Sequence, residues 1–162
     1  MALTIQTVDL ASLNQYPGNP RRGDVAAIAA SLEATGQYRP VVVQQSTRYI
    51  LAGNHTAQAA DRLGWTSIEA SLVDVDDSTA RQIVLADNRT ADLGTYDSDA
   101  LTDLLSATAQ ESMERVLAAG YSQADIDALA IAVQSPVDTI TEINVDDFNL
   151  AHTCPRCQFQ WE

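Results

Sequence analysis

A loop rich in proline, glycine and arginine carries side chains suited to binding phosphate. The segment "GNPRRGD", residues 18–24, places Arg21 and Arg22 just before an expected helix. A guanidinium group can hold a phosphate through two parallel hydrogen bonds. The alternative is a pair of solvated surface arginines, which contribute little to stability.

A second segment, "GNHTAQAA" at residues 53–60, lies where an apolar strand turns into an alanine-rich helix. Gly53 lets a backbone or a ligand come close, and the first N–H groups of a helix attract anions. Asn54 and Thr56 could add hydrogen bonds. His55 could be a ligand, a general acid or base, or an ordinary residue of the first helical turn. The segment therefore predicts an anion site at this joint.

A third segment, "LADNRTADL" at residues 85–93, interrupts the apolar face of an otherwise regular helix with Asp87, Asn88 and Arg89. Polar residues in such a position belong either to a satisfied structural network or to a functional site. An ion pair between Asp87 and Arg89 is the structural interpretation.

The C-terminal tail contains His152, Cys154 and Cys157, and the "CPRC" spacing suits two thiolate ligands of one zinc ion. A closed structural zinc site has four ligands, and the tail supplies three. The fourth could be Asp147, a residue of the main domain, or a residue of a second copy in a homodimer. The alternative is a pair of free thiols.

Periodicity predicts the elements that position these segments. An edge strand is expected near the N-terminus, and a helix capped by Asp24 is expected to end at Gly36. A left-handed cap is expected at Gly64, and Ala80, Ile83, Val84 and Leu93 are expected to face inward from a later helix. The expected strands are residues 3–10, 39–44, 48–53 and 67–75, and the expected helices are 25–35, 54–63 and 77–93.

The character of the sequence changes after residue 95. Acidic amphipathic helices are expected over residues 97–110 and 122–133, and a polar linker without clear periodicity follows. The expected organisation is a domain over residues 1–95, an acidic helical extension over 96–134, and a linker with a zinc-binding tail over 135–162.

Composition limits the partners. The 162 residues carry a formal net charge of -13, and all nine basic residues are arginine. This balance argues against a broad basic surface for nucleic acid, so DNA would be met through a small patch, a nucleotide-sized site or a partner chain. The simpler interpretation of the charge is solubility. The sequence shows no apolar run of about 20 residues and no signal peptide, so we expect a cytoplasmic protein without a membrane anchor.

The order of these segments resembles the ParB-type N-terminal domain of the ParB/sulfiredoxin superfamily. The resemblance runs through "NPRR", "GQYRPVVV", "YILAGNHTAQAADRLGW" and "RQIVLADNRTADL" and covers roughly Leu3 to Leu93. It is nearest to stand-alone members from bacteriophages and mobile elements. The resemblance implies an α+β fold with a small mixed sheet and packed helices, followed here by the acidic extension and the CPRC tail.

The resemblance also implies a pocket for CTP or another nucleoside triphosphate with magnesium. By position its lining would be Arg21 or Arg22, the segment Gly53 to Thr56, and Asn88 with Arg89. Two departures are clear. Thr56 replaces an arginine of the ParB "GxxR" turn, and Asn54 and His55 stand where sulfiredoxin has its reactive cysteine, which excludes the reductase chemistry.

Three functions remain open at this point. The first is a nucleotide-binding module in DNA transactions of a phage or mobile element, reaching DNA directly or through a partner protein. The second is an enzyme on the same pocket, either a nuclease or a nucleotide-dependent phosphotransferase or hydrolase. Its candidate catalytic residues are Asp87 and His55, and Glu33 is a further candidate base. The third is an acidic adaptor that mimics DNA or docks a basic partner, which the net charge and the short tail with zinc-ligand spacing favour. The helix-turn-helix domain by which ParB reads its DNA site is not recognisable in this sequence.

Overall fold

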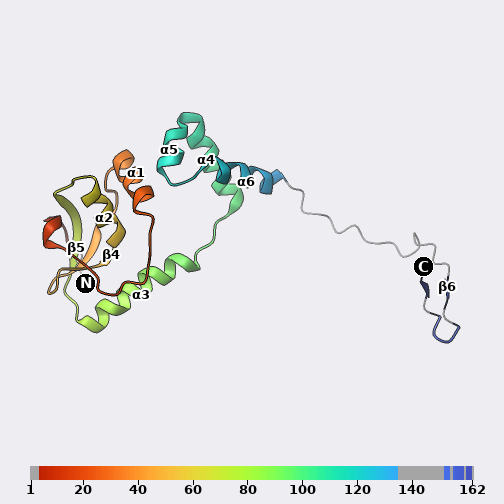
Figure 1. The fold of residues 1–162 in the computed structure, drawn as a ribbon, viewed down its shortest axis with the longest axis horizontal. Coiled ribbons are helices and arrows are strands. Elements are labelled where there is room, and N and C mark those ends of the chain that lie inside the picture. Colours follow the sequence, from red (N-terminus) through yellow and green to blue (C-terminus); the bar gives the residue numbers. More distant parts are fainter. Residues whose placement is uncertain (1–3, 135–151, 154, 159, 162) are drawn as a thin grey trace.

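The protein folds around a mixed β-sheet. The computed structural model describes residues 4–134, 152–153, 155–158 and 160–161 (Figure 1). Within them a five-stranded sheet has the order β1-β5-β3-β4-β2. β3 runs parallel to β5 and antiparallel to β4, whereas β1 is an antiparallel edge strand beside β5. The strands are β1 (Thr4–Asp9), β2 (Asn14–Gln15), β3 (Val41–Gln44), β4 (Tyr49–Ala52) and β5 (Ser67–Val73).

Helices cover both faces of this sheet. α1 (Val25–Thr35) and α2 (Asn54–Arg62) pack on one face, and α3 (Asp77–Leu93) packs on the other. Because side chains alternate along a strand, Val41 and Val43 face the first pair of helices whereas Val42 faces α3. The predicted α+β architecture is therefore confirmed.

The first face holds the larger core. Its strand residues are mostly branched and its helix residues are mostly alanine, which lets α1 and α2 approach the sheet closely. This cluster includes Ala29, Leu32, Val41, Val43, Ile50, Ala57, Ala59, Ala60, Ile68 and Ala70.

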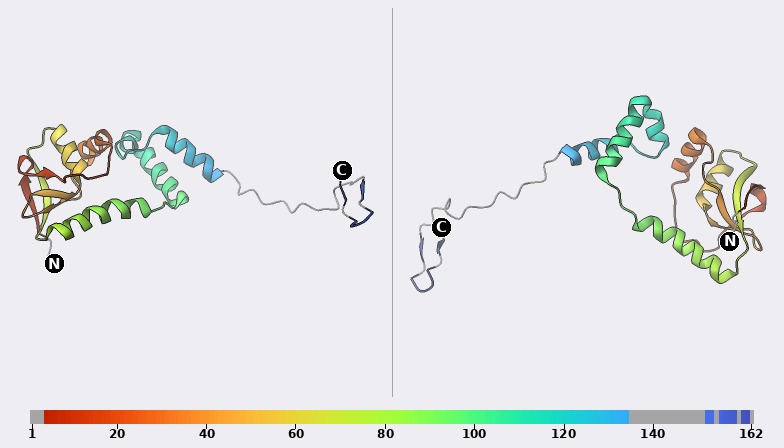
Figure 2. Two further views of the ribbon diagram at one scale, coloured as in Figure 1. Left: turned by 60° about the horizontal axis from the view of Figure 1, so that its bottom comes forward. Right: turned by 180° about the vertical axis from the view of Figure 1, so that it is seen from behind.

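The second face is smaller, with Leu51, Val73, Ala80 and Val84 buried against one another. Only the first half of α3 contributes buried residues. Leu93, which was expected to face inward, is 61% exposed because the last turns of α3 extend past the sheet (Figure 2).

Aspartate side chains cap the N-termini of most of the long helices. Asp24 accepts hydrogen bonds from the backbone N–H groups of Ala26 and Ala27 at the start of α1. Asp76 caps α3 in the same way through Thr79. Such a cap satisfies N–H groups that have no partner inside the helix. Gly64, with φ of +77°, has the left-handed conformation that was predicted for it.

The described residues 94–134 form three helices, and the first and third correspond to those expected over residues 97–110 and 122–133. They are α4 (Ser98–Glu111), α5 (Met113–Ala118) and α6 (Gln123–Gln134). Ser112 has an extended backbone, with φ of -166° and ψ of 122°, and this separates α5 from α4. Leu105 and Val116 are buried within this unit. α5 lies beside α1 in the views of Figures 1 and 2.

Two short strands, β6 (His152–Thr153) and β7 (Gln160–Trp161), pair near the C-terminus. Cys157 is exposed, whereas Cys154 and Asp147 lie outside the described residues. The described residues contain no group of three or more side chains suited to a metal ion, so the zinc site stays a prediction. Among the described helices, none is long and apolar enough to cross a membrane.

Candidate functional site

A cavity of about 220 Å³ lies where the arginine-bearing loop, the start of α2 and the middle of α3 meet. Three segments far apart in the sequence therefore converge, as was expected. The lining residues are Asn19, Arg21, Ile28, Arg39, Leu51, Gly53, Asn54, His55, Thr56, Asp87, Asn88 and Ala91. Arg22 and Arg89 are exposed and are not among them.

The start of α2 differs from the starts of α1, α3 and α4 because no side chain caps it. Gly53 occupies the cap position with φ of +88°, a conformation that favours glycine. A Cβ at Gly53 would lie 2.8 Å from Cγ1 of Val41, so this position has no room for a side chain. The first N–H groups of α2 have no partner inside the helix and are free for an external acceptor.

Asn54 fastens this joint to its surroundings. Its side chain is buried, and its Oδ1 accepts a hydrogen bond of 3.0 Å from the backbone N–H of Tyr16. Its Nδ2 donates to the carbonyl oxygen of Ile50 at 2.8 Å. The amide group of Asn54 thus holds the chain at Tyr16 against β4. Because this amide is already paired, the backbone N–H groups of the joint are the donors that remain for a ligand.

His55 fastens the other end of the loop. Its Nε2 accepts a hydrogen bond of 3.0 Å from the backbone N–H of Gly23. The contact is close, since a Cβ at Gly23 would lie 2.8 Å from Cγ of the His55 ring. His55 therefore positions the loop that carries Arg21, and Gly23 is what allows this approach.

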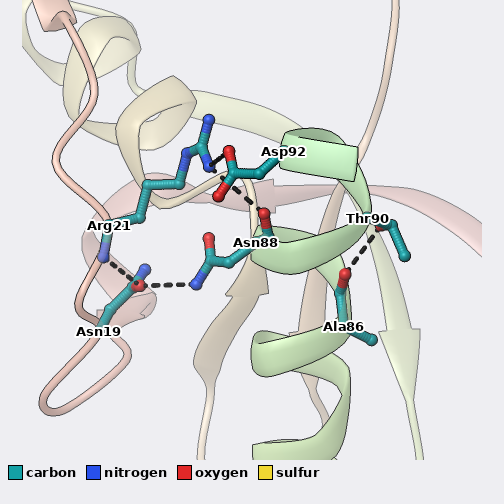
Figure 3. Close-up of polar contacts among 6 residues, drawn as sticks. All are labelled: Asn19, Arg21, Ala86, Asn88, Thr90 and Asp92. Carbon is teal, nitrogen blue, oxygen red and sulfur yellow. Dashed lines mark hydrogen bonds and ion pairs between the residues drawn. The ribbon is translucent and has the colours of Figure 1, made fainter. Parts of the chain in front are cut away.

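Arg21 lies between the loop and α3, as Figure 3 shows. Its Nη1 is 2.6 Å from Oδ1 of Asp92 and donates at 3.3 Å to the carbonyl oxygen of Asn88. Asn19 organises this contact, because its Oδ1 accepts from the backbone N–H of Arg21 at 3.1 Å and from Nδ2 of Asn88 at 3.2 Å. The Arg21 side chain keeps 40% of its surface exposed, so a ligand can reach it.

The other two predicted arginines point elsewhere for geometric reasons. Arg22 follows Arg21 in a non-helical loop, where successive side chains diverge. Arg89 follows Asn88 on α3, and neighbouring residues of a helix project about 100° apart. The same geometry explains why the described Asp87 and Arg89 form no ion pair, since residues two apart on a helix do not face each other.

Arg39 was missed at the sequence level. It lines the cavity from the chain just before β3. The signal was its position before Pro40, because a residue preceding proline is held extended. That constraint predicts the start of the strand but not its neighbours. Arg39 reaches the cavity at the start of α2 only because of the order of the strands in the sheet.

A second cavity of about 280 Å³ adjoins the first and shares Arg39, Gly53, Thr56 and Asp87 with it. Ser71 of β5 also lines it, and its buried Oγ has no hydrogen-bond partner among the described residues. Asp87 is the one carboxylate that lines either cavity within the described part of the chain. Two guanidinium groups, an uncapped helix start and one carboxylate form a site suited to a polyanion with a divalent cation.

Among solved structures, the chain is similar to the truncated chromosome-partitioning protein ParB of Caulobacter crescentus complexed with CTP-gamma-S. The TM-score is 0.67 at 19% identity, over 83% of this chain and 81% of that chain. The same protein complexed to the centromeric parS site gives 0.45 at 19% identity, over 82% and 73% of the two chains. Sulfiredoxin of Arabidopsis thaliana gives 0.43 at 21% identity, over 50% and 97%.

No curated protein matches the sequence. The first structural similarity establishes a shared fold. The model of the ParB N-terminal domain matches residues 2–89, which is more than half of the chain. The chain therefore belongs to the ParB N-terminal domain family, as its sequence motifs indicated.

Proposed function

We propose that this protein binds a nucleoside triphosphate with Mg²⁺ and that the phosphates lie at the start of α2. The observation that supports this most is the uncapped start of α2, which opens into a cavity lined by Arg21 and Arg39. Phosphate oxygens would accept hydrogen bonds from the free N–H groups, as the aspartate caps do at other helices.

Each wall of the cavity has a part in this proposal. Arg21 and Arg39 would neutralise charge on the phosphates, and the Thr56 hydroxyl would donate a hydrogen bond where ParB has an arginine. Mg²⁺ commonly binds through one or two carboxylates together with substrate phosphates. Asp87 would supply the carboxylate, and the ion would offset phosphate charge beside it.

The nucleoside would extend into the adjoining cavity. The two volumes together fall within the about 300–1,000 Å³ that is typical of small-molecule sites. Ser71 supports this placement, because a buried hydroxyl without a partner costs free energy unless a ligand pairs with it. Its Oγ is therefore a candidate contact for a polar atom of the base or ribose.

CTP is the first nucleotide to test, because the similar ParB structure from Caulobacter crescentus is complexed with CTP-gamma-S. Membership of the ParB family also supports a role in DNA transactions. We propose that these are the DNA transactions of a phage or mobile element. The net charge of -13 favours a partner protein or a small patch over a broad surface as the route to DNA.

The test compares two neighbouring arginines. Calorimetric titration of CTP, ATP, GTP and UTP with Mg²⁺ is carried out on the full chain, on Arg21→Gln and on Arg22→Gln. Loss of Arg21 removes charge-assisted hydrogen bonds, so we expect at least about tenfold weaker binding. Arg22→Gln changes the net charge by the same amount as Arg21→Gln, and it should bind the nucleotide within about twofold of the parent. If no triphosphate binds the parent, or both variants bind alike, the proposal is wrong.

An enzymatic function of the same pocket is the second candidate, favoured by the position of Asp87 between the two cavities. A carboxylate there could position a metal ion for phosphoryl transfer, nucleotide hydrolysis or DNA cleavage. Nucleotide turnover and DNA cleavage should be measured with the parent and Asp87→Asn. Activity that survives in Asp87→Asn would exclude this role for Asp87.

A further inference from the structure

A groove of about 530 Å³ runs between α1 and α5, outside the cavities described above. One wall is the outer side of α1, with Ala30, Glu33 and Ala34. The other wall comes from α5 and includes Glu114, Leu117 and Ala118. Figures 1 and 2 show the two helices side by side at the junction between the sheet and the helical extension.

Both walls of the groove carry exposed apolar side chains. The α1 wall carries small side chains at Ala30 and Ala34, both exposed, so another chain can approach the helix closely. Leu117 projects from α5 with 52% of its surface exposed. An exposed leucine beside a row of alanines offers area that a partner's apolar side chain could bury.

Each wall of the groove also carries a glutamate. Glu33 and Glu114 are exposed on opposite walls. Arg115 also lines the groove, but its Nη1 already lies 2.7 Å from Oε2 of Glu111. Residues 94–134 contain seven acidic side chains and only this one arginine. The local potential is therefore negative, and a cationic occupant is favoured.

Charge also decides between classes of occupant. A second copy of this chain carries the same net charge of -13, and duplex DNA is a polyanion, so both are repelled from an acidic groove. We propose that the groove docks a basic amphipathic helix of a partner protein. Its apolar side chains pack on Ala30, Ala34 and Leu117, and its lysines or arginines pair with Glu33 and Glu114.

A model peptide tests the chemistry of this surface. The probe is a labelled helical peptide of about 18 residues with lysine and leucine at helical spacing, and its counterpart has glutamate in place of lysine. Binding to the full chain is followed by fluorescence anisotropy at about 0.15 M salt, where nonspecific attraction is screened. We expect the lysine peptide to bind and the glutamate peptide not to bind.

Matched variants test the location. Glu33→Gln combined with Glu114→Gln should weaken the lysine peptide about tenfold, and Leu117→Ser should weaken it severalfold. The control combines Asp74→Asn with Asp103→Asn, which changes the net charge equally at exposed sites outside the groove. It should stay within about twofold of the parent. Circular dichroism confirms that each variant is folded.

Three results would overturn the proposal. Equal losses in the two double variants would mean nonspecific attraction to an acidic protein. If duplex DNA displaces the lysine peptide from the parent, and Glu33→Gln combined with Glu114→Gln abolishes this competition, the groove binds nucleic acid instead. A dimer in sedimentation that Leu117→Ser dissociates would assign it to a second copy. Glu33 and Glu114 line neither nucleotide cavity, so these results are independent of nucleotide binding.

Discussion

The starts of α2 and α3 meet the same physical requirement in opposite ways. Both helices begin with backbone N–H groups that lack partners inside the helix. At α3 the carboxylate of Asp76 accepts from Thr79 at 2.7 Å, so the protein satisfies its own donor. At α2 the cap is Gly53, which has no side chain, and the donors face a cavity lined by Arg21 and Arg39.

The difference shows how a binding site can arise from an omission. An aspartate at the start of α2 would compete with a phosphate for the same donors and would repel it. A glycine leaves the positive end of the helix available, and the two arginines add charge of the same sign. The proposed ligand would then complete α2 in the way that Asp76 completes α3.

The largest expected effect comes from Gly53→Ala. The new Cβ would lie 2.8 Å from Cγ1 of Val41 in a residue with φ of +88°, so we expect destabilisation of about 2–4 kcal/mol and loss of nucleotide binding. The control is Gly64→Ala, where φ is +77° but nothing lies within 4 Å of the Cβ, and about 1–2 kcal/mol is expected. Urea unfolding measures both. Equal losses would show that contact with Val41 does not matter.

A second effect concerns a buried polar side chain, Ser71, in the lining of the second cavity. The buried Oγ of Ser71 has no partner among the described residues. Ser71→Ala should therefore raise the free energy of unfolding by about 1 kcal/mol. If the nucleoside contacts this hydroxyl, the same variant binds nucleotide less tightly although it is more stable. A drop in stability would show that the hydroxyl has a partner in solution.

A third effect concerns competition for Arg21. Asp92 holds its guanidinium at 2.6 Å, and a phosphate must share or replace this contact. Asp92→Asn should therefore tighten nucleotide binding about two- to fivefold, because an exposed ion pair is worth at most about 1 kcal/mol. Titration calorimetry measures the change. Weaker binding by Asp92→Asn would mean that Asp92 positions Arg21 productively.

The smallest effect is a pH dependence confined to the start of α3. The hydrogen bond from the backbone of Thr79 lowers the pKa of Asp76 below its ordinary value of 3.8. A lowered pKa in the folded state stabilises the protein above the ordinary value, and this contribution is lost as the pH falls through the folded pKa. Below about pH 4 the parent should lose stability that Asp76→Ser, with a cap that does not titrate, retains. The measurement is the melting temperature of the parent and of Asp76→Ser as a function of pH. The same decrease in both proteins at low pH would show that titration of Asp76 does not affect stability.

Local patterns predicted most elements because their causes are local. Asp24 is followed by an alanine-rich apolar run, and the helix begins where a side chain can cap it. Gly53 ends a strand and Gly64 takes the left-handed conformation. The helix expected over residues 97–110 ends close to the end of α4, whereas the six-residue α5 was not assigned, because so short a segment shows little periodicity.

The site was predictable only in part, for a similar reason. The loop, the turn and the polar part of α3 could be recognised as segments, whereas the choice among neighbouring side chains depends on direction. Arg21 lines the cavity and Arg22 does not, although they are adjacent. Asp92 pairs with a residue 71 positions away in the sequence, which no local pattern reports.

By itself, the sequence determined where most of the longer helices and strands lie, which glycine joins β4 to α2, and how acidic the chain is. These follow from short-range hydrogen bonding, backbone freedom and composition. The tertiary structure decided that Arg39 joins the cavity, that His55 holds the loop at Gly23, and that α1 and α5 enclose a groove. Contacts between distant segments depend on sheet order and helix rotation, which arise only when the whole core packs.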